Sequence, residues 1–230
     1  MKKFVLVFFT AVLLVVPLSS NAGVGFVLDI KPASILFCPD MDGFSVYNNE
    51  SGSYYYSSYE DRIEGFGSFV PSLNAGVGIV TRIMYIDITG QIGYLVNGAF
   101  DGAFFGGDVA LRFRLGRAVS IGPHISFIGT DLSWGGVNSS GSVEIDDPTG
   151  TALGLSFTAG HPMISFSLNL DLVTFEEAYV DTWDGWYADR SYLDLSGFSI
   201  NMGVIFRFGG TSTARKKPKE DKPDYSDEYY

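Results

Sequence analysis

The chain has 230 residues, a formal net charge of −11 and 15% aromatic residues. This length suits a single barrel or a single sandwich. The acidic balance argues against a nucleic-acid partner, because nucleic-acid binding needs clustered Lys and Arg. Cys38 is the only cysteine, which excludes an internal disulfide and leaves this thiol without an expected role.

The first residues predict a secretory signal peptide. Lys2 and Lys3 give a positive start, residues 4–18 are almost uninterruptedly apolar, and small residues lead up to Ala22. This apolar stretch is too short to cross about 30 Å of hydrocarbon as a helix. We therefore expect residues 1–22 to be cleaved off. A mature chain that spans a membrane must then do so with strands, because only helices and closed barrels pair every backbone group in lipid.

Eight later stretches alternate between apolar and polar residues, a pattern typical of strands with one apolar and one polar face. The clearest is the last, where Ile200, Met202 and Val204 alternate with Asn201 and Gly203. The predicted strands cover residues 24–37, 67–80, 83–96, 104–115, 119–132, 151–160, from 163 onward, and 192–208.

The connections between these strands alternate in length. Short ones lie near residues 81–82, 116–118 and 160–162, and long ones near residues 38–66, 97–103, 135–150 and 176–191. Short turns at one rim and long loops at the other are typical of outer-membrane barrels, whereas a soluble β-sandwich has no such rule. The sequence predicts an all-β fold over residues 23–209, an eight-stranded antiparallel up-and-down transmembrane β-barrel in a bacterial outer membrane.

The polar faces of these strands carry charged residues that would point into the barrel. An eight-stranded barrel is just wide enough to be filled by its own side chains, and buried charges need partners. Four acids and four bases therefore predict a salt-bridge network that closes the lumen. Its predicted members are Asp29, Lys31, Asp87, Asp108, Arg112, Arg114, Asp171 and Arg207. The alternative is a narrow selective path lined by the three arginines.

The long connections are acidic and rich in Tyr and Trp. Such residues are favoured in recognition surfaces, so an extracellular ligand is one expected partner. The carboxylates show no spacing that resembles a calcium-binding loop, and we expect no metal and no cofactor. Residues 210–230 lack apolar periodicity and predict a disordered periplasmic tail, with contact to peptidoglycan or a periplasmic protein as the sharper alternative.

His124 and Ser126 lie two residues apart on a predicted strand, so they share a face and could form a base and a nucleophile. Lipid A deacylase, an eight-stranded outer-membrane barrel, is similar in carrying His-x-Ser on a strand together with a Glu. In that family the pair faces lipid, whereas here it falls on the inward face. No acid matches clearly, Asp131 and Glu144 being the nearest candidates. We therefore expect that this protein is not an enzyme. A lipid A-modifying hydrolase that uses His124 and Ser126 is kept as a third hypothesis, after a structural or adhesive role and a narrow channel.

The closing segment carries the most specific resemblance. Asn201, Gly203, Phe206 and Phe208 are spaced like the β-signal by which the outer-membrane assembly machinery recognises its client barrels. The chain resembles small eight-stranded barrels of the outer membrane protein A, X and W type. That resemblance implies insertion by this machinery, a Gram-negative-type envelope and contact with outer-membrane lipid or lipopolysaccharide. It implies a structural or adhesive role, or passage of small or hydrophobic solutes, and does not choose among them.

Overall fold

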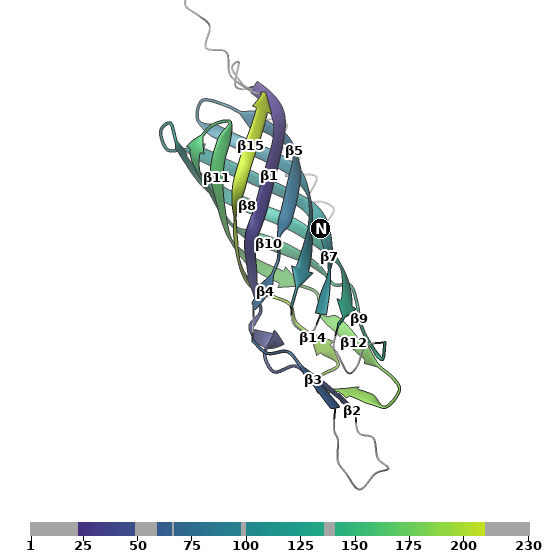
Figure 1. Ribbon diagram of the computed structural model, residues 1–230. Helices are drawn as coiled ribbons and strands as arrows, with labels where there is room; N and C mark the ends of the chain where they lie inside the picture. The colour runs from purple at the N-terminus through teal and green to yellow at the C-terminus, as the bar shows by residue number, and fades with distance from the viewer. Residues whose placement is uncertain (1–22, 49–58, 66, 98–99, 136–140, 210–230) are drawn as a thin grey trace, which may run out of the picture.

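A computed structural model describes residues 23–48, 59–65, 67–97, 100–135 and 141–209 of the chain (Figure 1). The predicted signal peptide and the predicted C-terminal tail lie outside these residues. No helix in the described part of the chain has the length and apolar character needed to cross a membrane.

Eight long strands form a closed antiparallel barrel, which confirms the predicted fold class. Each strand pairs with the next one along the chain, and the last strand pairs with the first, so the sheet has no free edge. The barrel strands are β1 (Gly23–Phe37), β5 (Ser72–Val80), β6 (Met84–Val96), β7 (Phe100–Arg114), β8 (Val119–Trp134), β10 (Thr149–His161), β11 (Ile164–Phe175) and β15 (Gly197–Gly209).

The observed strands differ from the predicted ones where the chain leaves the barrel wall. The predicted strand at 67–80 is divided at Val70 and Pro71 into β4 (Gly67–Phe69) and β5, since Pro71 has no N–H to donate to a ladder. The predicted strand at 192–208 is likewise divided, and only its second part belongs to the barrel. Strand β7 begins at Phe100, so the connection expected at 97–103 is short rather than long.

A β-bulge in β1 changes which residues face inward. The register against β15 shifts between Ile30 and Ala33. Before the shift Asp29 and Lys31 are buried, and after it Ser34 and Leu36 are buried, so the inward positions change from odd to even. A bulge inserts one extra residue into a strand, and simple alternation cannot locate it.

The outer wall of the barrel is apolar. Every second residue along each barrel strand faces outward, and many of these residues are large, hydrophobic and more than a third exposed. They are Val24, Phe26, Ile30, Ile35, Leu73, Val77, Ile92, Tyr94, Val96, Phe105, Phe113, Ile121, Phe127, Leu153, Leu155, Ile164, Phe166, Leu170, Leu172, Phe198, Met202 and Phe208. An exposed apolar surface of this extent is typical of a protein that contacts lipid or another protein rather than water alone.

The described parts of the long connections form a cap at the end of the barrel opposite the C-terminus of β15 (Figure 1). One small sheet contains β2 (Ser45–Asn48), β3 (Tyr59–Arg62) and β13 (Trp186–Ala188), and the other contains β9 (Val143–Ile145), β12 (Ala178–Thr182) and β14 (Tyr192–Leu193). A short 3-10 helix, η2 (Pro39–Met41), precedes β2. The sequence predicted only long acidic connections here, because these short strands pair with segments far away along the chain and local alternation does not show such pairs.

Candidate functional site

The interior of the barrel has two unlike halves. Near the short turns the inward side chains are polar or charged, and near the cap they are apolar. In β11, for example, Ser165, Ser167, Asn169 and Asp171 are followed by the apolar Val173 and Phe175. This division follows from the order of inward residues along each strand, so it can be read from every second position of the strand sequences.

Asp87 is the centre of a group of ion pairs in the polar half. Its Oδ2 accepts from Nη1 of Arg112 and, at 2.7 Å, from Nη2 of Arg207. All three residues are at most 3% exposed. Arg112 also donates from Nε to Ser156 Oγ at 2.7 Å. One carboxylate therefore holds two buried guanidinium groups, one from β7 and one from β15.

A second group of ion pairs is centred on Asp108. Its Oδ2 lies 3.4 Å from Lys31 Nζ and 2.5 Å from His124 Nε2. The other ring nitrogen of His124, Nδ1, lies 2.7 Å from Asp171 Oδ1. Lys31 also lies 3.6 Å from Asp29, whose Oδ1 accepts from Ser167 Oγ at 3.0 Å. These contacts join strands β1, β7, β8 and β11 across the lumen.

His124 completes the charge balance of this interior. Both of its ring nitrogens face carboxylate oxygens, which only accept when ionised, and a histidine that donates from both nitrogens is the positively charged imidazolium. With His124 charged, four buried acids face four buried bases. Sequence analysis placed His124 on the inward face but did not include it in the predicted network, although acidic residues on the same faces of other strands were the available signal.

The structure places the predicted network residues as follows. Asp29, Lys31, Asp87, Asp108, Arg112, Asp171 and Arg207 are buried in the lumen and joined by the ion pairs above. Arg114 differs, because it is half-buried at the end of β7. It donates to the Thr81 carbonyl at 3.2 Å and lies over the Tyr85 ring, which Arg207 also covers. Arg114 therefore contacts the rim of the barrel rather than the acids inside.

The apolar half of the lumen continues into the cap as one hydrophobic core. Inward residues of the barrel strands pack against buried residues of η2 and of the small sheets. The core consists of Leu36, Cys38, Met41, Phe44, Val46, Ile63, Leu95, Phe100, Leu132, Trp134, Val143, Ile145, Ala152, Val173, Phe175, Ala178, Val180, Trp186, Leu193 and Leu195. This core closes the end of the barrel that the polar network leaves open.

Cys38 belongs to this core. It is 0% exposed, and its Sγ–H donates to the Leu195 carbonyl at 2.8 Å. Burial, with Asp194 and Asp40 nearby, raises the pKa of the Cys38 thiol to about 12. A buried thiol that stays protonated is a packing residue rather than a reactive one.

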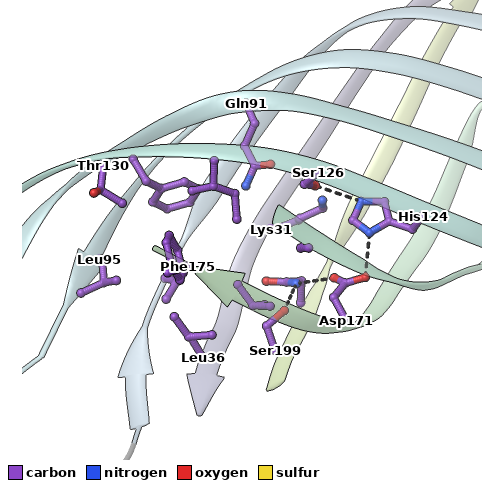
Figure 2. Close-up of a pocket in the computed structure, with 16 residues that line it drawn as sticks. Lys31, Leu36, Gln91, Leu95, His124, Ser126, Thr130, Asp171, Phe175 and Ser199 are labelled. Carbon is purple, nitrogen blue, oxygen red and sulfur yellow. Dashed lines mark hydrogen bonds and ion pairs between the residues drawn. The ribbon is translucent and has the colours of Figure 1, made fainter. Parts of the chain in front are cut away.

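A small chamber of about 50 Å³ lies between the two halves (Figure 2). Figure 2 shows Lys31, His124, Ser126 and Asp171 on one side of it and Leu36, Leu95 and Phe175 on the other. A space of this size has room for a few water molecules. It is too small for a lipid.

The geometry of His124 and Ser126 does not favour the hydrolase hypothesis. Ser126 Oγ lies 3.4 Å from His124 Nε2, while the same nitrogen lies 2.5 Å from Asp108. A base that activates a hydroxyl must be free to accept its proton, and here that nitrogen faces a carboxylate. Both residues are 3% exposed and face the chamber. Neither Asp131 nor Glu144 takes part, since both are exposed.

The four residues of the predicted assembly signal lie on β15 at the seam of the barrel. Asn201 donates to Asp171 Oδ2 at 3.2 Å, and Phe208 is 52% exposed on the outer wall beside Phe206. A Cβ at Gly203 would lie 2.1 Å from the Ile30 carbonyl oxygen. Glycine is therefore needed here for the close approach of β15 to β1, whatever its role in recognition.

Within the described residues, no group of three or more His, Cys, Asp or Glu side chains could hold a metal ion. No family model and no curated protein matches the sequence.

Three solved structures are similar to this chain. Neisserial surface protein A matches at 14% identity and a TM-score of 0.38, over 82% of this chain and 98% of that one. The outer membrane protein OprG from Pseudomonas aeruginosa matches at 11% identity and 0.41, over 83% and 98%. Ail, the attachment invasion locus protein of Yersinia pestis, matches at 10% identity and 0.35, over 82% and 99%. At these values the likeness assigns no function.

Proposed function

We propose that this chain spans a bacterial outer membrane as a sealed barrel and acts at the cell surface through its ordered cap, in an adhesive or envelope-stabilising role. The observation that carries the proposal is that the lumen is closed twice. Buried ion pairs fill the half near the short turns, and an apolar core fills the half near the cap.

The membrane part of the proposal rests on the outer wall. Large apolar residues are exposed on every barrel strand, and a closed barrel is one of the two structures that pair every backbone group in lipid. The predicted signal peptide and the closing segment of β15 support export and insertion by the barrel assembly machinery. Outer-membrane lipid or lipopolysaccharide would then surround the apolar wall.

The surface role rests on the cap. An ordered core fixes the positions of its exposed side chains, and a fixed surface binds with a smaller loss of conformational entropy than a flexible loop does. Exposed aromatic residues of the cap include Tyr179, Trp183, Tyr187 and Tyr192. A sealed lumen leaves this surface as the part of the protein best placed to meet a partner.

Two measurements test the proposal in order. Boiled and unboiled outer-membrane samples are first compared on SDS gels, where a folded barrel is expected to change its mobility on boiling. The purified protein is then reconstituted in planar bilayers, where we expect no unitary current steps. Soluble periplasmic protein without a mobility shift would overturn the membrane proposal. Reproducible current steps that decrease in Arg112→Ala would overturn the sealed lumen and favour the narrow channel.

A further inference from the structure

The small sheet of β9, β12 and β14 has one buried face and one exposed face. Ala178, Val180 and Leu193 are buried in the cap core. The alternate residues point the other way, because successive side chains of a strand lie on opposite faces. On that side Tyr179 is 54% exposed and Tyr192 is 43% exposed. The outer face of this sheet is therefore available for contact.

Two cross-strand pairs define this outer side. Tyr179 lies directly opposite Tyr192, and Asp181 lies directly opposite Glu144. Asp146 continues the row after Glu144, since its N–H donates to the Tyr179 carbonyl at 2.9 Å and its side chain is exposed. We refer to these five residues as the aromatic–acidic face.

The pairing of Asp181 with Glu144 is unfavourable by itself. Like charges directly opposite each other destabilise an antiparallel pair. The described cap has two basic residues, and neither lies on this sheet. Arg190 donates to the Asp40 carbonyl at 2.9 Å and lies over the Phe44 ring, and Arg62 belongs to β3 in the other small sheet. The aromatic–acidic face therefore has no cation of its own among the described residues of the cap.

The cap as a whole carries a negative charge. Its described acidic residues outnumber its two arginines several-fold. They are Asp40, Asp42, Glu60, Asp61, Glu64, Glu144, Asp146, Asp147, Glu176, Glu177, Asp181, Asp184, Asp189 and Asp194. Such a surface repels anionic lipids and attracts cations over a distance of about 8 Å at physiological salt.

The chemistry of the face selects an organic cation rather than a bare metal ion. Its carboxylates are not among any group that could hold a metal in the described chain. Tyrosine rings attract ammonium and guanidinium groups within about 6 Å of their centroids. The stems of Lys and Arg are apolar and lie along aromatic surface while the charged head reaches a carboxylate.

Building on the proposed cell-surface function, we propose that the aromatic–acidic face binds a Lys- and Arg-rich polypeptide segment. One basic side chain lies along Tyr179 and Tyr192 and places its charged head between Asp181 and Glu144. Asp146 receives a second basic residue of the same segment. Binding removes the like-charge repulsion between β9 and β12, so the partner also stabilises the sheet.

The test uses the full-length protein in zwitterionic nanodiscs and a fluorescent oligolysine peptide, with binding followed by anisotropy. We expect binding that weakens as salt rises, and a loss of at least about tenfold in E144Q/D181N, since two charge-assisted contacts are removed. Y179S/Y192S should lose several-fold. The matched control is E60Q/E64Q, which removes the same charge from β3 and the segment after it and should stay within about twofold of the unchanged protein.

Each outcome is decisive. All variants are first checked for the mobility shift of the folded barrel, so that unfolding is not read as lost binding. Equal weakening in E144Q/D181N and E60Q/E64Q would mean attraction to the whole cap and would overturn the assigned face, as would no binding at all. A barrel that does not conduct and does not bind oligolysine would refute this inference alone. A barrel that conducts would refute the proposed function, whatever its binding of the peptide.

Discussion

The two halves of the barrel interior are closed by different forces. Near the short turns the lumen is held by a few ion pairs, in which Asp87 and Asp108 each join several strands. Near the cap it is held by an apolar core in which no single contact dominates. Removing one partner of a buried ion pair leaves an uncompensated charge, while truncating a core residue leaves a cavity. Substitutions in the polar half should therefore cause large losses of stability at a few specific residues. Substitutions in the apolar half should cause smaller losses at many residues.

The largest expected effect is at Asp87. In Asp87→Asn the guanidinium groups of Arg112 and Arg207 stay buried without their carboxylate, and the free energy of unfolding should fall by about 3–5 kcal/mol. Urea unfolding in detergent micelles, followed by tryptophan fluorescence, measures this loss. Arg114→Gln is the control, because Arg114 lies at the rim and should cost less than about 1 kcal/mol. Equal losses in the two variants would contradict the network.

The next effect is in the apolar half. Phe100 is 0% exposed in the core, and Phe100→Ala should cost about 3 kcal/mol through the cavity that it leaves. We expect this loss mainly in the cap, so that proteases cut the cap faster while the barrel keeps its mobility shift on gels. Simultaneous loss of both properties would show that the cap and barrel unfold as one unit.

A smaller effect is expected at His124, where charge can be restored. His124→Gln removes one positive charge and should cost about 2 kcal/mol, and adding Asp171→Asn should recover part of that loss because the buried charges balance again. The double-mutant cycle measured by urea unfolding gives the coupling between the two residues. Simple additivity would argue that His124 is neutral in the folded barrel.

The smallest expected effect on stability concerns Cys38. Its pKa rises from 9.0 to about 12 in the folded protein. The contribution of the protonated Cys38 thiol to the free energy of unfolding is fully present below pH 9. It is lost as the pH rises toward 12, because only the unfolded thiol is deprotonated in that range. At pH 8 the folded protein should react with a thiol reagent about a thousandfold more slowly than the urea-unfolded protein. Comparable labelling rates would place the thiol outside the core.

Alternation between apolar and polar residues predicts the parts of this protein in which the position of a residue along its strand decides which way its side chain faces. It gives the closed barrel, the apolar outer wall and the inward side of residues such as Asp108 and Asp171. It cannot give the bulge after Ile30, because an inserted residue depends on how β1 fits against β15. It also cannot place Arg114 at the rim, since the end of a strand is set by the turn beyond it.

The cap was beyond prediction for a different reason. Its strands are short, and their partners come from connections that are far apart in sequence, as with Tyr47 opposite Tyr187 and Ile145 opposite Val180. Buried residues such as Phe44, Val46 and Trp186 were visible as apolar residues inside the acidic loops. Nothing local distinguishes an apolar residue that packs on a distant loop from one that is exposed.

Closure of the barrel depends on the seam between β1 and β15. It joins Gly25 to Gly209, so the first strand of the barrel waits for the last before its outer edge is hydrogen-bonded. Without β15 the sheet would have two unpaired edges, and unpaired edges can pair with other chains. A chain cut short within β15 is therefore not a weaker barrel but an aggregation-prone sheet.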